Sequence, residues 1–552
     1  MEIKYILFAL FLTLILSSCS KKPDALYING KIHTLDENNT IVEAVAVRNG
    51  LIIDLGTTKE ISEKYGPENI INLENNTVIP GLIDCDGSLV EFSKNFLYTV
   101  YLNNVKSLQD LRSKIKNKSS DLSNGDWIVF YNLNMTDSLI EKINKNFIDE
   151  VAKDINVVLV DSLKILTIIN SKGIETLQIT NQIPDPKNGE IQKDKKGNLT
   201  GLFFDDAQKL IYENIPELNR KQVCNSVEKG SKELLRYGIT EIHDRTIGKE
   251  AIELLKELID SNKLSVKVYG VLTGSDEGFE DYLEKGLIEN YKDKLTVRAV
   301  SLDYDGAFEL QEASMNDEYK TEPKVKQPYI DEKTINDVFT KAIDKNFQFR
   351  IKVVGDKGLS EVLTALDKII KSKNPKDHRT ILEYVEFTNP PEINKMKELN
   401  IIPSLRPETT INDIENLPNL LSNVKLRNIG LWKTLLQSSG KFITGSGFPF
   451  ENQINPFLQM YFLVSGKSLD SDNNKIQNPE QKISILDAIK SYTIWAAYSA
   501  FEEKIKGSIE KGKVADMVVL SDDIFVGDTN ILLKVKALKT IINGKVVYDY
   551  TK

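Results

Sequence analysis

This chain of 552 residues has few histidines, few cysteines and no excess of basic residues, and each of these features excludes a class of protein. The three histidines, at positions 33, 243 and 378, share no motif with the spacing of metal ligands, so a histidine-rich metal centre is not expected. Three cysteines far apart in the sequence cannot supply a disulfide framework. Because 80 acidic residues outnumber 71 basic ones and give a net charge of −9, no basic field attracts nucleic acid, which we exclude as a partner.

The N-terminal segment carries an apolar stretch, residues 6–16, that is too short to span a bilayer. Its pattern is typical of a secretory signal peptide, and the sequence Leu-Ser-Ser-Cys at 16–19 resembles a bacterial lipobox. The resemblance implies that a signal peptide, residues 1–18, is removed, that Cys19 is lipidated, and that residues 19–24 form a tether. We therefore expect an exported bacterial lipoprotein, anchored to a membrane through Cys19 on its periplasmic or cell-surface side. An ordinary signal peptide followed by an incidental cysteine is the alternative.

Both ends of the remaining chain are rich in β-branched residues and contain Asn-Gly dipeptides. These dipeptides stand at residues 29–30, 49–50 and 543–544, and Asn-Gly between apolar runs is a strong hairpin signal. Strands from opposite ends of a chain can share a sheet when the middle is a closed unit with neighbouring termini. The sequence therefore predicts one small β-sandwich domain built from residues 25–77 and 505–552.

Between these ends, apolar β-rich runs alternate with helical patterns, which is typical of a parallel α/β sheet. The length of the series predicts a (β/α)₈ TIM-type barrel over residues 78–504, with insertions at 90–150 and 180–220. The apolar runs expected to form strands are 78–83, 155–160, 238–244, 265–272, 294–306, 346–356, 379–387, 400–405 and 441–447.

A set of short motifs follows the same order along the chain. They are VAVRNGLIIDLG, VIPGLID, LTGLFFDDA, GITEIHD, DGA, VVGD, ILEY, GSGFPF, YTIWAAYSAFEE and GSIEKGKVADMVVL. Together they resemble the amidohydrolase superfamily, and within it the family 3 branch that includes N-substituted formamide deformylases. The resemblance implies hydrolysis of non-peptide carbon–nitrogen bonds. It also implies zinc or another divalent ion as cofactor, which polarises the scissile carbonyl and lowers the pKa of a bound water.

The family holds that ion with a His-x-His after the first barrel strand, a lysine, two later histidines and a final aspartate. In this chain other residues stand at all six corresponding positions, which are Asp86, Ser88, Ser301, Lys352, Tyr384 and Gly447. Of the three histidines, only His243 ends a strand where the barrel mouth is expected, and one histidine cannot rebuild the site. We therefore expect that the metal site is lost and that the protein carries no metal cofactor.

The replacement at position 352 suggests what stands where the ion would be. A Lys352 ammonium would place a positive charge there, and Asp84, Asp86 or Glu383 could pair with it. Such a pair would avoid leaving a buried charge unmatched.

The first function that fits these observations is that of a pseudoenzyme with a ligand-binding or assembly role. A small molecule would occupy the barrel mouth, and the sequence identifies no protein partner. Aromatic and polar candidates for contact with that molecule are Tyr304, Tyr384, Arg406 and Trp495.

The alternative is an active, metal-independent hydrolase. Its acid–base groups would come from Lys352, Asp86, Glu383 and His243. Cys85 is a poor candidate nucleophile, since the acidic residues on either side of it raise a thiol pKa.

Overall fold

The structure is a computed structural model. It describes residues 22–103, 105–134, 137–140, 142–275, 278–322, 325, 327–422, 428–449, 454–469 and 478–551. The expected signal peptide and Cys19 lie outside these residues. Within the described part of the chain, no helix combines the length and the apolar composition needed to cross a membrane. The chain folds as two compact units, the first from residues 1–88, 232–259 and 265–552 and the second from residues 89–231 and 260–264.

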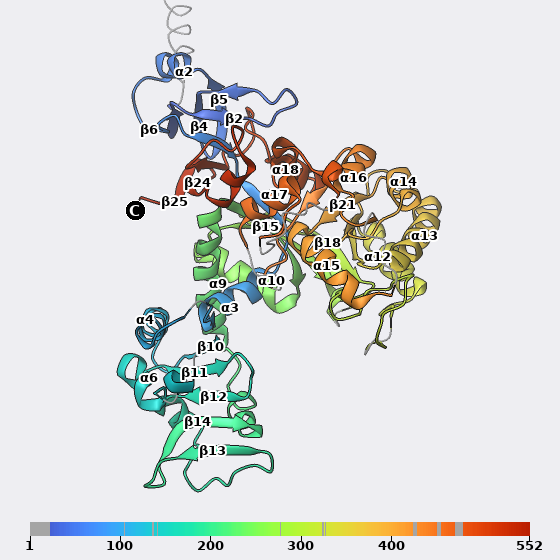
Figure 1. Cartoon of the computed structure of the whole chain (residues 1–552). Coiled ribbons are helices and arrows are strands. Elements are labelled where there is room, and N and C mark those ends of the chain that lie inside the picture. Colours follow the sequence, from blue (N-terminus) through green and yellow to red (C-terminus); the bar gives the residue numbers. More distant parts are fainter. Residues whose placement is uncertain are drawn as a thin grey trace, which may run out of the picture. The chain divides into compact units, whose positions relative to one another are not determined.

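The first unit contains a β-sandwich made from both ends of the chain, as predicted (Figure 1). One sheet has the order β5-β4-β1-β6 and the other β25-β24-β23-β7-β2-β3. Their strands are β1 (Ala25–Ile28), β2 (Lys31–His33), β3 (Ile41–Val42), β4 (Ala44–Arg48), β5 (Leu51–Gly56), β6 (Ile70–Asn72), β7 (Thr77–Pro80), β23 (Met517–Leu520), β24 (Ala537–Ile542) and β25 (Lys545–Asp549). Because β7 pairs with β2 on one side and with β23 on the other, the two ends of the chain contribute strands to one sheet.

Two of the three Asn-Gly dipeptides form the hairpins predicted for them. Residues 49–50 join β4 to β5 and residues 543–544 join β24 to β25, and all four have the positive φ that such tight turns require. Residues 29–30 are different, because they lead from β1 in one sheet to β2 in the other. The hairpin prediction is wrong there, since an Asn-Gly turn does not specify which sheet receives the next strand.

The rest of the first unit is the predicted (β/α)₈ barrel. Its parallel strands are β8 (Leu82–Gly87), β15 (Ile239–Ile247), β16 (Lys267–Thr273), β18 (Leu295–Asp303), β19 (Gln348–Lys352), β20 (Ile381–Glu383), β21 (Ile402–Leu405) and β22 (Ile443–Thr444), neighbours in that order. At the carboxyl end the ring continues from β22 to β8, where the Gly447 N–H donates to the Asp86 carbonyl at 2.7 Å. Nearby, the Ser88 N–H donates to the Phe448 carbonyl at 3.0 Å.

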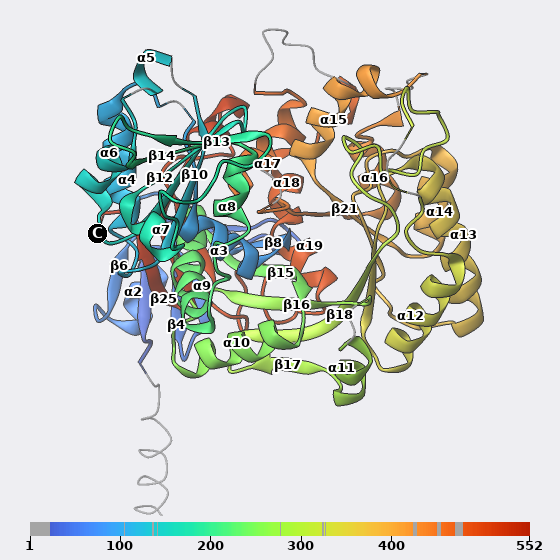
Figure 2. The same ribbon diagram turned by 90° about the horizontal axis from the view of Figure 1, so that it is seen from below.

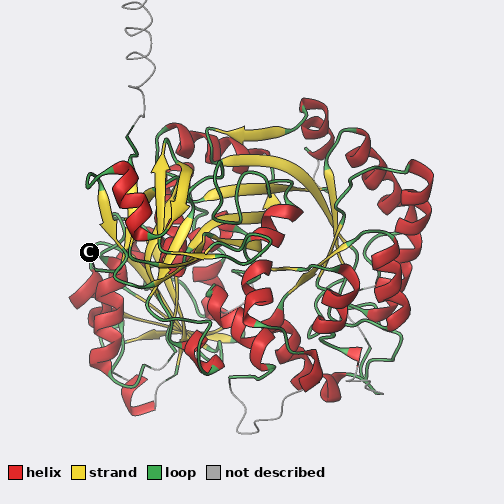
Figure 3. Cartoon of the chain, turned by 90° about the horizontal axis from the view of Figure 1, so that it is seen from above, coloured by secondary structure: helices red, strands yellow, loops and turns green. Residues whose placement is uncertain are grey.

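Helices cover the outside of this ring. Figure 2 shows α12 (Glu332–Asp344), α13 (Asp356–Lys373) and α14 (Pro390–Glu398) outside the curved strands, and Figure 3 shows helices outside the ring of strands. The sequence of α13 explains its packing, because its buried apolar residues recur at helical spacing and form one stripe. They are Leu359, Val362, Leu363, Leu366 and Ile369.

Buried ion pairs join the C-terminal segment to the amino ends of the barrel strands. Lys267 at the start of β16 lies 2.5 Å from Asp516, and both side chains are 6% exposed. Lys506 forms ion pairs with Glu241 of β15 and with Glu502. Since each charge is removed from water, each depends on its partner.

The second unit is built on a separate six-stranded sheet of order β13-β14-β12-β11-β10-β9. Its strands are β9 (Thr99–Tyr101), β10 (Trp127–Leu133), β11 (Asn156–Asp161), β12 (Leu166–Ile169), β13 (Gly189–Lys193) and β14 (Leu199–Asp205). The run 155–160, which we expected in the barrel, is therefore strand β11 of this sheet. Alternate residues of β11 enter two different apolar cores. A strand buried on both faces reads as a continuous apolar run in either setting.

The Lys267–Asp516 pair gives a test of how the C-terminal segment is held. Lys267→Met leaves the Asp516 carboxylate buried without its cation, so the free energy of unfolding should fall by about 3–5 kcal/mol. Urea unfolding followed by circular dichroism measures the change. Lys368→Met, which breaks an exposed pair with Glu332, is the matched control and should change stability little. Equal effects of the two substitutions would contradict the assigned role.

Candidate functional site

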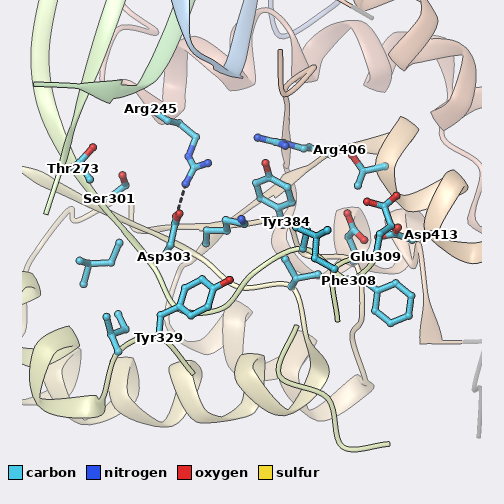
Figure 4. Close-up of a pocket in the computed structure, with 18 of the residues that line it drawn as sticks. Arg245, Thr273, Ser301, Asp303, Phe308, Glu309, Tyr329, Tyr384, Arg406 and Asp413 are labelled. Carbon is cyan, nitrogen blue, oxygen red and sulfur yellow. Dashed lines mark hydrogen bonds and ion pairs between the residues drawn. The ribbon is translucent and has the colours of Figure 1, made fainter. Parts of the chain in front are cut away.

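A cavity of about 720 Å³ opens at the carboxyl ends of the barrel strands, where TIM barrels carry their sites. Figure 4 shows its polar side chains converging from several strands, with Arg245 from β15, Asp303 from β18 and Arg406 directly after β21. The apolar part of the wall consists of Leu302, Ala307, Phe308, Leu310, Ile330 and Val354.

The six positions of the family's metal ligands all lie at this end of the barrel. Ser301, Lys352 and Tyr384 line the cavity. Asp86 is buried at the end of β8 and Ser88 directly follows that strand. Gly447 follows β22 and contacts both Asp86, through its N–H, and Arg406.

Arg406 lies against three of these positions, Asp86, Tyr384 and Gly447. Its Nε donates to Asp86 Oδ2 at 2.6 Å, and its guanidinium carbon lies 3.6 Å from the centroid of the Tyr384 ring. Gly447 has φ 76°, and a Cβ built on it would approach the Arg406 guanidinium carbon to 2.7 Å. An aspartate at 447, as the family has, therefore cannot coexist with this position of Arg406.

Two further arginines hold Glu383 at the end of β20. The Nε of Arg350 donates to Glu383 Oε1 at 2.5 Å, and the Nε of Arg245 lies 2.6 Å from Glu383 Oε2. Arg245 also lies 3.7 Å from Asp86 Oδ1 and donates to Asp303 at 2.8 Å. Opposite charges thus form a continuous chain across the mouth of the barrel.

These contacts correct the expected role of Lys352 as the counter-ion of a carboxylate. In the described part of the chain, no ion pair joins Lys352 to Asp84, Asp86 or Glu383, since arginines already neutralise Asp86 and Glu383. Lys352 instead places its Nζ 4.9 Å from the centroid of the Tyr384 ring. Burial lowers the pKa of Lys352, and the nearby negative charge of Asp303 opposes that shift.

Arg245 and Arg350 were not predicted from the sequence. Arg350 precedes Lys352 by two residues on β19, so both lie on the same face of the strand. Arg245 follows His243 on β15 by the same spacing. The spacing of two residues along a strand was the sequence signal that could have identified both arginines. It puts them on the same side of their strands as His243 and Lys352, the side that faces the barrel interior.

The remaining candidates are distributed as follows. Tyr384 and Arg406 line the cavity as expected, whereas Tyr304 and Trp495 are not among its lining residues. Tyr304 donates to Glu361, and Trp495 packs against Phe442.

His243 is fully buried beside Tyr269 and does not line the cavity. Burial lowers the pKa of His243 well below its usual value, so its ring is neutral at physiological pH. Burial likewise raises the pKa of the Cys85 thiol well above its usual value, which disfavours a thiolate.

Two buried carboxyl groups shape the loops around the mouth. Asp305, in the DGA motif, accepts hydrogen bonds from the backbone N–H groups of Ser314, Val354 and Gly355. Asp84 accepts from the backbone of Asp86 and from that of Ser446. Both motif aspartates therefore hold backbone in place rather than presenting free carboxylates to the cavity.

The side chains present do not fit the divalent ion that the family uses. Across the described ranges, no group of three or more histidine, cysteine, aspartate and glutamate side chains is arranged to hold a metal ion. Asp86, the one acidic residue among the six positions, accepts a hydrogen bond from Arg406 and lies beside Arg245. A divalent ion at Asp86 would face two guanidinium cations, which repel it.

The carboxyl of Asp84 predicts a pH dependence of stability. Burial raises the pKa of Asp84 from 3.8 to about 7, so the folded chain keeps a proton that the unfolded chain loses. The free energy of unfolding therefore falls as the pH rises through this window. Asp84→Asn removes the carboxyl and keeps its shape, so the difference in stability between about pH 5 and about pH 8 should shrink.

Urea unfolding at the two pH values measures this difference. Asp281→Asn, at an exposed position, should leave the difference as it is in the parent chain. A parent and an Asp84→Asn variant with equal pH dependence would show that Asp84 does not hold the extra proton.

Comparison with known proteins agrees with this architecture. The sequence model of the amidohydrolase family matches residues 69–548 of this chain. The putative amidohydrolase YtcJ of Bacillus subtilis (strain 168) is 26% identical over 535 residues, which cover 95% of this chain and 99% of that protein. The N-substituted formamide deformylase of Arthrobacter pascens is 21% identical over 545 residues, covering 96% and 99%.

Among solved structures, an uncharacterized metal-dependent hydrolase from Pyrococcus furiosus has the same fold. The two superpose with a TM-score of 0.69 at 22% sequence identity, over 91% of this chain and 100% of that chain. The match to the family covers the whole barrel and, in the sandwich, strands β6, β7, β23, β24 and most of β25, but not β1 to β5. The resemblance seen in the motifs is thus confirmed, and the chain belongs to the amidohydrolase family.

Proposed function

We propose that this amidohydrolase-family barrel binds a small molecule at its mouth without a metal ion and without the family's hydrolysis. The observation that carries the proposal is the position of Arg406. Its guanidinium contacts both Asp86 and Gly447, two of the positions where family members hold the ion. A permanent cation of the protein therefore takes the place in which the catalytic metal would have to sit.

The cavity beside these arginines supports a binding role rather than a purely structural one. It has the size of a small-molecule site and combines an apolar wall with a few converging polar groups.

A metal-independent hydrolase is the second candidate, and Lys352 is the observation that favours it. Its ammonium lines the cavity and its pKa is lowered by burial, as acid–base and nucleophilic lysines require. The other candidate groups support this function less. Asp86 and Glu383 are held by arginines, and His243 does not line the cavity.

We also propose that the protein is a lipoprotein anchored through Cys19, which would place the barrel at the surface of a bacterial membrane. The support is the apolar segment followed by Leu-Ser-Ser-Cys.

The metal-free proposal predicts how the purified mature protein responds to zinc and to a chelator. Because guanidinium groups neutralise the carboxylates at the mouth, the protein should retain no stoichiometric metal after purification. Neither added zinc nor EDTA should change its melting temperature. Elemental analysis and calorimetry measure both. One tightly bound zinc ion per chain would overturn the proposal.

Turnover separates the two candidate functions. A panel of N-acyl and formamide compounds, assayed with and without zinc, should show no hydrolysis if the barrel only binds. Hydrolysis that is independent of zinc and abolished by Lys352→Ala, but kept in Lys357→Ala on the exposed side of α13, would favour the metal-independent enzyme.

Lipidation has its own test in cells that export the protein. Cys19→Ala should abolish incorporation of a labelled fatty acid and release the protein from the membrane fraction, since the thiol carries the anchor. Cys224→Ala, in helix α9 (Arg220–Leu234), is the control and should be labelled as the parent is. Labelling of the Cys19→Ala variant would contradict the anchor.

A further inference from the structure

We infer that the molecule bound at the mouth is a small carboxylate with an apolar, aromatic-sized body. Its carboxylate would contact Lys352 beside Arg245, and its body would lie on the apolar wall. This inference rests on the proposed binding function and adds the chemical class of the ligand.

The state of the cations at the mouth points to an anionic ligand. Arg245, Arg350 and Arg406 each have a carboxylate partner within the protein. Lys352 differs, because no hydrogen bond or ion pair of its ammonium is found in the part of the chain that the structure describes. Among the described residues, the contact of this half-buried ammonium is the face of the Tyr384 ring, which replaces its lost hydration only in part. A ligand carboxylate would supply the missing acceptor through a charge-assisted hydrogen bond.

The surroundings of Lys352 fix where that carboxylate would lie. The ammonium lies over the face of the Tyr384 ring. Among the nearby negative charges, that of Asp303 raises the pKa of Lys352 most. Asp303 is already engaged by Arg245 at 2.8 Å, and its side chain is 52% exposed. The Lys352 ammonium therefore remains available on the cavity side, with Arg245 adding to the positive field.

Two of the acidic lining residues lie away from Arg245: Figure 4 shows Glu309 and Asp413 across the cavity from Arg245 and Asp303. Asp303, the acidic residue at the cationic end, is paired with Arg245. A ligand with its negative group at Lys352 keeps that group away from Glu309 and Asp413, whereas a ligand with negative charge at both ends would meet them. The separation favours a monocarboxylate.

The wall between the two ends is apolar and aromatic. Phe308 and Leu302 are buried residues of this wall, Tyr329 also lines the cavity, and Leu310 is 65% exposed. An exposed leucine beside buried aromatic rings gains from contact with an apolar body. The volume of about 720 Å³ leaves room for a ring and a short linker beyond the carboxylate.

Three probes that differ only in charge test this assignment on the mature protein: 4-phenylbutanoate, its neutral amide and 4-phenylbutylamine. Isothermal titration should show that the acid binds most tightly, the amide more weakly and the amine least. Lys352→Met should weaken binding of the acid about ten-fold, the equivalent of one charge-assisted hydrogen bond, while leaving the amide nearly unchanged.

Two further variants control for damage to the fold. Lys352→Arg keeps a cation and should retain most of the preference for the acid. Lys357→Met, five residues on and exposed on α13, should bind all three probes as the parent does. Added salt should weaken the acid more than the amide.

The outcomes separate this inference from the function on which it rests. Equal binding of acid and amide, or stronger binding of the amine, would overturn the carboxylate and leave a metal-free binding site. Failure of the acid to bind would also overturn it. A stoichiometric zinc ion in the same protein would instead overturn the proposed function itself.

Discussion

The ion pair between Arg406 and Asp86 is the interaction on which the architecture of the mouth depends. It joins the end of the seventh barrel strand, β21, to the end of the first, β8. Beside it, the backbone of Gly447 completes the ring by donating to the Asp86 carbonyl. With the guanidinium in this position there is no room for a side chain at 447. A larger residue there would displace Arg406, so the glycine permits the position that this cation takes at the mouth.

The residues at 301 and 384 fit the same arrangement. Beside the guanidinium, a lysine at 301 or a histidine at 384 would add a further positive charge or an unused donor. The chain has an aromatic ring at 384, which stacks on Arg406, and a small hydroxyl at 301. Arg245 and Arg350 then balance Glu383. Restoring a metal site would require moving Arg406 and adding a carboxylate at 447 together, because either change alone leaves a clash or an unpaired charge.

Much of the fold could be predicted from the sequence, because each barrel strand and each hairpin leaves a local pattern. The family motifs also pointed to the six positions at which other residues were expected in place of metal ligands. What they could not supply was the partner of each charge. Lys352 was expected to pair with the carboxylates there, whereas the cations that pair with Asp86 and Glu383 are Arg406, Arg245 and Arg350, outside those six positions. A sequence motif shows which residue stands at a family position, but only the fold shows which residues from other strands pair with it.

The difference between the arginines and the lysine explains why the mouth is both rigid and open to a ligand. A guanidinium presents several donors in one plane, and at this mouth those of Arg245 and Arg350 reach carboxylates and a backbone carbonyl. These guanidinium groups are held in place and cannot turn toward a ligand without breaking their ion pairs. The Lys352 ammonium sits on a flexible stem and rests on the Tyr384 ring, a contact weaker than an ion pair. In the proposed binding mode a carboxylate would draw Lys352 away from the ring while the arginine scaffold keeps its geometry, so that the lysine would serve recognition and the arginines the fold.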